Sequence, residues 1–180
     1  MDNSIRRSYI AYNLSTIPPR ARISSAKLTL YCVADDKEET YLQVDVHAVD
    51  DNSTEGTITW NNAPAIGSVV SSNLVGPKNQ FYTWDIASYV QSEYESDKIA
   101  SMALRFPFDD PENLTGQPIH HRDFGSREAP EDFRPCVEIT CAGPPPRPPQ
   151  PRPPSPSNYP CQYRLPLLLH RHRRVELAQN

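Results

Sequence analysis

Apolar and polar residues alternate with a period of two along most of this chain. Such alternation indicates β-strands that bury one face of a sheet and expose the other. The alternation assigns Leu28, Leu30, Val44 and Val46 to a common core. The predicted strands lie at residues 8–14, 26–33, 42–48, 57–60, 81–84, 102–106, 120–124 and 137–141.

One segment departs from this period. Between Asp85 and Glu95, the apolar residues Ile86, Tyr89, Val90 and Tyr94 recur at helical spacing. The spacing predicts one short amphipathic helix, with Asp85 at its N-cap.

Short strands with a single helix are typical of an all-β fold, and we expect an antiparallel, jelly-roll-like β-sandwich. Only 37% of the residues are hydrophobic, and no apolar run approaches the roughly 20 residues of a membrane span. The sequence contains no nucleotide-binding, zinc-protease or serine-hydrolase motif. These absences argue against the common enzyme classes and against an integral membrane protein.

Proline and charge divide the chain near Gly143. Eleven of the 20 prolines lie between Pro144 and Pro166. Residues 1–141 hold 12 Lys and Arg against 21 Asp and Glu, a net charge of −9, whereas residues 142–180 carry +5. We therefore expect a folded domain at 1–142, an extended proline-rich linker at 143–160, and a basic, disordered segment at 161–180.

Several short segments follow one another in a recognisable order. They are Arg-Ser-Tyr-Ile at 7–10, Ser-Ala-Lys-Leu-Thr-Leu-Tyr at 25–31, Glu-Gly-Thr-Ile-Thr-Trp-Asn-Asn-Ala-Pro at 55–64, and Phe-Gly-Ser-Arg-Glu at 124–128. Together they resemble the family 96 carbohydrate-binding modules, also described as DNRLRE domains. The resemblance covers roughly residues 6–141.

The resemblance implies a jelly-roll β-sandwich from a secreted protein that carries further domains, such as polysaccharide-degrading modules. Members of the family begin with another strand before the Arg-Ser-Tyr-Ile segment, so we expect this chain to be a fragment, or the product of a truncated gene model, that lacks its N-terminal strand. The family includes binders of acidic glycans. A body of net charge −9 would repel a polyanion, which leaves neutral glycans as an alternative.

Aromatic and arginine side chains are the candidates for sugar contact. Tyrosine rings stack on the apolar faces of sugars, and arginine can grip a carboxylate with two hydrogen bonds. We expect Trp60 and Trp84 to pack in the core instead, and we consider a structural brace from Arg127 to Glu128 as an alternative role for that arginine. The candidate ligand-binding residues are Tyr31, Tyr41, Tyr82, Arg122 and Arg127.

The sequence gives weaker indications of a metal site and of disulfide bonds. Paired aspartates at 35–36, 50–51 and 109–110 could hold a structural calcium ion, although solvated turn acids are the commoner explanation of such pairs. The four cysteines allow three pairings; Cys32 and Cys141 are both in phase with core residues, as reduced thiols or as a buried bridge. No catalytic or metal-binding constellation stands out, and no cofactor is expected.

The sequence thus predicts a non-catalytic module that binds cell-wall or extracellular polysaccharide, outside the cell or in the cell wall. We expect no nucleic-acid partner and no membrane span. A structural or adhesive surface module without a sugar site is the alternative. A fragment of a polysaccharide-degrading enzyme is a third interpretation.

Overall fold

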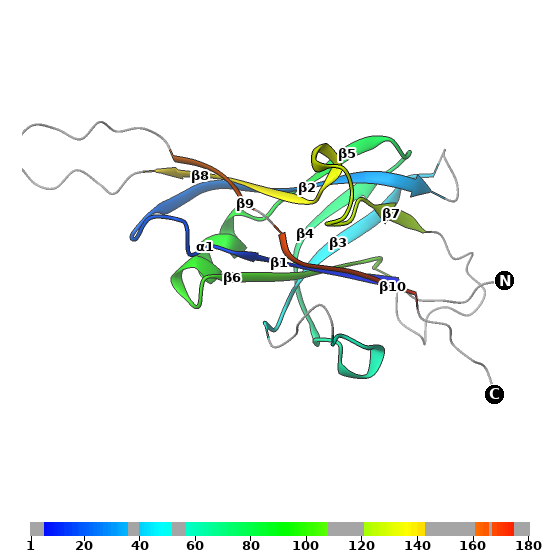
Figure 1. The fold of residues 1–180 in the computed structure, drawn as a ribbon, viewed down its shortest axis with the longest axis horizontal. Helices are drawn as coiled ribbons and strands as arrows, with labels where there is room; N and C mark the ends of the chain where they lie inside the picture. Colours follow the sequence, from blue (N-terminus) through cyan, green and yellow to red (C-terminus); the bar gives the residue numbers. More distant parts are fainter. Residues whose placement is uncertain are drawn as a thin grey trace, which may run out of the picture.

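Two antiparallel sheets pack face to face (Figure 1). The computed structural model describes residues 6–35, 40–51, 57–107, 121–142, 161–165 and 167–174. The first sheet has the order β10 (Leu167–Arg174), β1 (Arg6–Asn13), β6 (Ile99–Arg105), β3 (Leu42–Val49) and β4 (Ile66–Val75). The second has the order β5 (Gln80–Asp85), β2 (Arg22–Asp35), β8 (Cys136–Ala142) and β9 (Cys161–Leu165), and β7 (Arg122–Phe124) also pairs with β2.

The core lies between the two sheets, as the alternation predicted. Leu28 and Leu30 of β2 face Val44 and Val46 of β3, and none of the four is more than 3% exposed. Fully burying each such aliphatic side chain contributes roughly 1.5–3 kcal/mol to folding. The all-β, antiparallel sandwich expected from the sequence is therefore confirmed.

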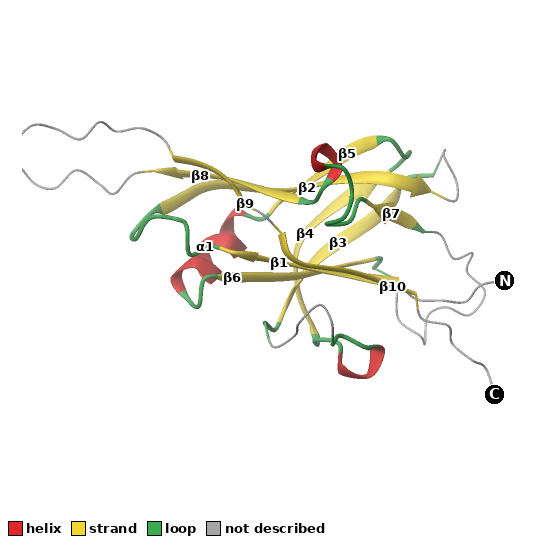
Figure 2. Cartoon of the chain, viewed as in Figure 1, coloured by secondary structure: helices red, strands yellow, loops and turns green. Residues whose placement is uncertain are grey.

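Helix α1 (Ala87–Glu95) closes one end of the sandwich (Figure 2). It contacts β2 of the second sheet and β6 of the first, and it buries Val90 and Tyr94. Ile86 occupies the N-cap position rather than Asp85. The Asp85 carboxylate nevertheless accepts a hydrogen bond from the Ala87 N–H at 3.0 Å, so it still satisfies one orphan donor of the first turn.

The strand predicted at residues 57–60 is wrong. A turn at Thr57 leads into a short 3-10 helix, η1 (Trp60–Asn62). The Asn62 side chain donates to the Thr57 carbonyl at 2.9 Å and accepts from the Thr59 hydroxyl at 2.7 Å. These local side-chain bonds replace the ladder partners that a strand would need.

Strand β4 was missed for a different reason. Most of its residues are exposed or half-buried, and it occupies the edge of the first sheet beside β3. An edge strand with little buried surface has no need of a regular apolar period. Its sequence, rich in Ser and Val with one Gly, accordingly shows none.

The segment expected to be disordered at 161–180 differs from that expectation. Strands β9 and β10 lie there, antiparallel to β8 and β1 respectively. Both sit beside an open sheet edge, where backbone hydrogen bonds hold a strand regardless of its side-chain pattern. The proline-rich linker and residues 175–180 lie outside the described residues.

The outer face of the first sheet is covered. Ile58 packs there on Tyr9, Ala11 and Ala103, in a small apolar cluster separate from the main core. The isoleucine of the Thr-Ile-Thr-Trp segment is thus a structural residue. No helix in the described part of the chain is both long and apolar enough to cross a bilayer.

Candidate functional site

The outer face of the second sheet presents a regular array of polar and aromatic side chains. Strand β2 alternates between core residues and the outward Lys27, Thr29 and Tyr31. The register places Thr83 of β5 beside Thr29, and Phe81 of β5 beside Tyr31. Lys27 lies between Asp85 of β5 and Glu138 of β8. The face therefore carries hydroxyls and charges at one end and aromatic rings at the other.

Three rings form an aromatic platform, which we define as Tyr31, Phe81 and Phe133. The ring centroids of Tyr31 and Phe133 are 4.2 Å apart with an interplanar angle of 29°, which is a stacked geometry. Phe81 tilts against Tyr31 at 4.9 Å and remains 52% exposed. An exposed phenylalanine gains nothing from core burial, so the platform is the part of this face that folding does not explain.

The third ring is brought onto the platform by the loop after β7. The Gly125 N–H donates to the Tyr31 carbonyl at 2.9 Å, and Phe133 ends the short 3-10 helix η3 (Glu131–Phe133). A Cβ at position 125 would lie 2.2 Å from the Phe133 carbonyl oxygen, closer than atoms can approach. Only glycine at position 125 lets its backbone approach the backbone of Phe133 this closely. The position of the Phe133 ring on the platform depends on this contact.

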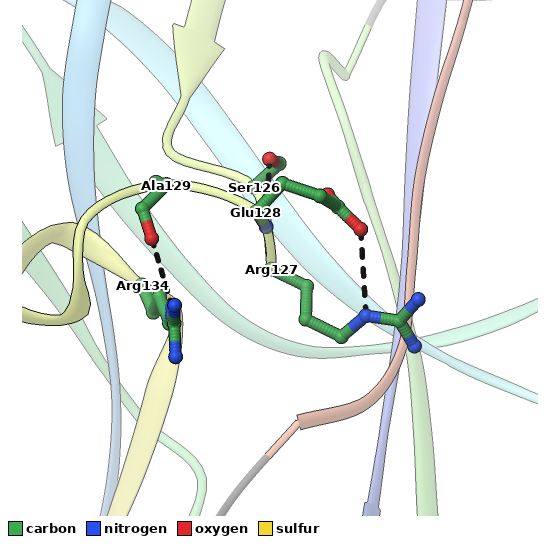
Figure 3. Close-up of polar contacts among 5 residues, drawn as sticks. All are labelled: Ser126, Arg127, Glu128, Ala129 and Arg134. Atoms are coloured by element: carbon green, nitrogen blue, oxygen red, sulfur yellow. Dashed lines mark hydrogen bonds and ion pairs between the residues drawn. The ribbon is translucent and has the colours of Figure 1, made fainter.

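Polar contacts inside the loop fix its shape (Figure 3). The Arg134 Nε donates to the Ala129 carbonyl at 2.8 Å, and the Glu128 N–H donates to the Ser126 hydroxyl at 3.2 Å. Arg127 and Glu128 form an ion pair at 3.4 Å. Because both side chains are largely exposed, this ion pair contributes little to stability. The arginine also remains accessible to solvent. The Phe-Gly-Ser-Arg-Glu segment is thus mainly a loop-building unit.

Of the sequence-predicted residues, one belongs to the aromatic platform and a second lies on the loop that completes it. Tyr31 is a member of the aromatic platform, and Arg127 lies on the same loop that delivers Phe133. Tyr41 is 61% exposed just before β3 and rests over Gly76, where an added Cβ would meet its ring at 2.5 Å. No contact joins Tyr41 to the platform among the described residues.

The other two predicted residues are buried. Tyr82 shares the inward face of β5 with Trp84, is 9% exposed, and donates its hydroxyl to the Pro77 carbonyl at 2.8 Å. Arg122 is 5% exposed, and its guanidinium donates to the carbonyls of His121 and Thr40. In this arrangement both side chains support the fold and offer no surface to a ligand.

Sequence reasoning missed Phe81 and Phe133. Phe81 has a signal that could have found it, since it lies three residues before Trp84, which was expected in the core, and an odd spacing on a strand puts the two side chains on opposite faces. Phe133 follows no period and reaches the platform only through the folded loop. Trp84 is 1% exposed with its Nε1–H donating to the Val44 carbonyl at 2.9 Å, as expected for a core residue. The side chain of Trp60 lies outside the described residues.

A separate groove of about 840 Å³ lies between residues 19–24 and helix α1. Arg20, Arg22 and Lys98 line it together with Gln91 and Glu95. Two hydrogen bonds hold its walls: Gln91 Oε1 accepts from the Ile23 N–H at 2.7 Å, and the Tyr94 hydroxyl accepts from the Ala21 N–H at 3.2 Å. Backbone φ angles of 65° at Arg20 and 68° at Lys98 place both residues in the left-handed region, an uncommon conformation for side chains of this kind.

Among the described residues, one cluster of three carboxylates could contribute to a metal site. Oxygens of Asp51, Glu93 and Asp97 lie within 4.8 Å of one another. Burial raises the pKa of Asp51 and of Glu93, and a hydrogen bond from Asp51 lowers the pKa of Asp97. Three carboxylates could contribute to a calcium site, which takes six to eight oxygens. Of the other acidic pairs, Asp35 accepts from the Lys78 N–H, while 36, 109 and 110 lie outside the described residues.

Comparisons with known proteins agree with this architecture. One relative is a gellan lyase from a Bacillus species, 31% identical over 106 residues. The match covers 56% of this chain and only 4% of that much longer protein. The model of carbohydrate-binding module family 96 matches residues 1–140 of this chain. With more than three quarters of its length matched, the chain belongs to carbohydrate-binding module family 96.

Proposed function

We propose that this chain is a non-catalytic module that binds an extracellular polysaccharide on the outer face of its second sheet. The observation that carries the proposal is the aromatic platform of Tyr31, Phe81 and Phe133, where rings gather outside the core. The apolar faces of sugar rings stack on such side chains.

The surroundings of the platform suit a carbohydrate. Thr29 and Thr83 lie next along the same face, with Lys27, Asp85 and Glu138 in the following row. Their side chains offer both donors and acceptors to sugar hydroxyls. A polysaccharide chain that runs along β2 would therefore stack one unit on the platform and hydrogen-bond the next units to these rows.

The other two predicted residues on the surface take secondary roles in this proposal. Arg127 is exposed beside the platform loop and can donate to a hydroxyl or a carboxylate. Tyr41 provides a single exposed ring away from the platform. Tyr82 and Arg122 act indirectly, by holding the sheet and the loop in place.

The gellan lyase similarity suggests the setting of the module. That relative acts on a polysaccharide, and we infer that this chain belongs to a larger secreted protein that acts on or adheres to an extracellular glycan. Gellan is therefore the first polysaccharide to test, with alginate and neutral glycans beside it. A structural or adhesive module without a sugar site would bind none of them, and an enzyme fragment would convert one of them.

The test measures binding of purified chain to these polysaccharides by affinity electrophoresis and calorimetry. Losing a stacking ring removes roughly 0.5–1.5 kcal/mol beyond its buried area, so Phe81→Ala and Tyr31→Ala should weaken binding several-fold. Leu74→Ala is the matched control, since Leu74 is 57% exposed on β4 of the first sheet and belongs neither to the platform nor to the polar rows beside it. Its affinity should equal that of the parent chain.

Two results would redirect the proposal. Unchanged affinity in both platform variants, together with weaker binding by Arg20→Ala or Lys98→Ala, would move the site to the groove beside α1. Binding to none of the glycans tested would favour the structural or adhesive role, and release of unsaturated or reducing sugars would reveal an enzyme.

A further inference from the structure

The β8–β9 pairing brings together two cysteines that are far apart in the sequence. Cys161 opens β9, on the far side of the proline-rich linker from β8. The antiparallel register sets Cys141 directly opposite Cys161, with Thr140 opposite Gln162 and Ile139 opposite Tyr163. Cys141 is 2% exposed on the inward face of β8. The pair therefore lies at the linker end of the second sheet.

Directly opposed residues in an antiparallel ladder have Cα atoms about 4.5–5.5 Å apart. A disulfide needs Cα atoms roughly 4.4–6.8 Å apart. Opposed residues also project from the same face of the sheet. The register thus satisfies the two backbone requirements for a bridge between Cys141 and Cys161.

The same register excludes the other pairings. Cys141 lies opposite Ile23 on β2, and Cys32 follows nine residues later along that strand, roughly 30 Å away at 3.3 Å per residue. The buried Cys32–Cys141 bridge considered from the sequence is therefore ruled out. Cys136 is five residues from Cys141 on β8 and faces the other side of the sheet, roughly 16 Å along the strand.

Cys32 and Cys136 are also separated. Cys136 lies opposite Thr29, and Cys32 is three residues further along β2 with its side chain in the core. Three residues of strand span roughly 10 Å, beyond the reach of a disulfide. Both thiols are buried, and the register leaves neither of them opposite another cysteine.

We propose that Cys141 and Cys161 form a disulfide that fastens the C-terminal strands to the domain. The bond forms by thiol–disulfide exchange with an external low-molecular-weight disulfide. One thiolate attacks that disulfide and releases a thiol, and the second thiolate then displaces the other half from the mixed disulfide. The two cysteine sulfurs are oxidised by one electron each, their two protons are released, and the external disulfide is reduced to two thiols.

The bridge would close residues 142–160, the linker region, into a loop. It would hold β9 on the edge of the second sheet, and through the adjoining chain it would keep β10 beside β1 in the first sheet. A covalent tie suits this position, because β9 has only five residues and an edge strand has one ladder partner. The inference rests on register alone and does not depend on the proposed glycan site.

Peptide mapping of the full chain tests the bridge. The chain is equilibrated with oxidised glutathione, unfolded and treated with a maleimide without reductant, then cleaved after glutamate. Cleavage after Glu138 and Glu176 isolates a peptide that contains Cys141 and Cys161 and no other cysteine. This peptide should carry no label and weigh about 2 Da less than its reduced form, as expected for the loss of two hydrogens. Cys32 and Cys136 should both be labelled.

Two maleimides on that peptide after oxidation would overturn the proposal, as would its linkage to a peptide with Cys32 or Cys136 or to a second chain. The Cys136→Ser variant is the matched control and should keep the bridge. A thermal melt provides an independent readout. Closing a loop of this length should raise the midpoint by roughly 5–10 °C over the reduced protein, and Cys161→Ser should show no such dependence on reductant.

Discussion

The second sheet carries aromatic side chains on both of its faces, and the two groups differ in their packing and in their exposure to solvent. On the inner face, Trp84 meets Phe124 edge to face at 6.0 Å, and its ring nitrogen donates to a carbonyl of the opposite sheet. On the outer face, the platform rings stack on one another while Phe81 stays half exposed. Neighbouring residues of the same strand thus serve two different purposes.

The comparison shows how the module separates stability from recognition. The inner aromatics gain free energy by filling the core, and any change in their shape leaves a cavity. Of the outer rings, Tyr31 and Phe81 stand on β2 and β5 and Phe133 is placed by the loop after β7, so none of them fills the core. Substitutions on the two faces should therefore produce distinct phenotypes, and the following experiments compare them from the largest expected effect to the smallest.

Trp84→Ala should have the largest effect on stability. Removing a fully buried indole costs roughly 3–5 kcal/mol in the free energy of unfolding, and it also leaves the Val44 carbonyl without its donor. Urea denaturation measures the change. Phe81→Ala, three residues away on the same strand, is the control and should cost less than about 1 kcal/mol. Equal losses in the two variants would erase the distinction between the faces.

Arg122→Met should lower the free energy of unfolding by roughly 2–3 kcal/mol, because two carbonyls beside this buried position lose their charged donor. Arg127→Met removes an exposed arginine whose ion pair is weak, and its free energy of unfolding should change by less than about 0.5 kcal/mol. The two arginines are five residues apart in sequence, so they compare burial with exposure directly. A large loss of stability in Arg127→Met would show that its salt bridge, rather than the backbone contacts, holds the loop.

Gly125→Ala sharpens the comparison because it acts on the loop rather than on a ring. The added methyl group would collide with the Phe133 carbonyl, and relieving the clash requires the loop to move, at a cost of roughly 1–3 kcal/mol. Phe133 would leave its position on Tyr31, so glycan affinity should fall together with stability. Ser126→Ala, at the next position, is the control and should keep both nearly unchanged. Intact affinity in the glycine variant would show that Phe133 is dispensable for binding.

Tyr12→Phe should produce the smallest change and should be favourable. The ring of Tyr12 is fully buried between the sheets, and its hydroxyl has no hydrogen-bond partner in the described structure. Removing an unpaired buried hydroxyl should raise the free energy of unfolding by up to about 1 kcal/mol. Tyr89→Phe is the matched control of opposite sign, since the Tyr89 hydroxyl donates to the Ser101 carbonyl at 2.6 Å.

The pH dependence of the same variant gives a second check. Burial raises the pKa of Tyr12 in the folded chain well above 10, its value when unfolded. The associated stability is therefore present below pH 10 and is lost as the pH rises further, because only the unfolded chain ionises. Tyr12→Phe should lose less stability than the parent chain between about pH 9 and pH 11. An unchanged alkaline slope would contradict the burial of this hydroxyl.

The sequence predicted the inner half of this molecule well and the outer half poorly. The alternation of β2 and β3 identified the core at Leu28, Leu30, Val44 and Val46, because burial forces a period of two on any strand that faces a core. Tyr31 was found by the same logic, as the outward partner of those residues. Fold and family thus followed from local pattern.

What the sequence did not predict depends on contacts between distant residues. The ability of arginine to grip a carboxylate led to Arg122 as a ligand candidate, yet its guanidinium turns inward and donates to the carbonyls of Thr40 and His121. Phe133 reaches Tyr31 through a loop whose path is fixed by Gly125, and no period encodes that path. Strand β4 and the two C-terminal strands occupy sheet edges, where backbone pairing suffices and the side-chain pattern is weak.

The position of β1 in the first sheet has a consequence for how the chain folds. Tyr9 pairs with Ala103 of β6 on one side and with Arg171 of β10 on the other, and neither partner is near it in sequence. Strand β1 is therefore synthesised long before β6 and β10, and it must wait for them before it finds a neighbour in the first sheet. Such non-local pairing slows folding to milliseconds or seconds. Until then, β1 is an unpaired apolar strand, and the newly made chain is at its most vulnerable to aggregation.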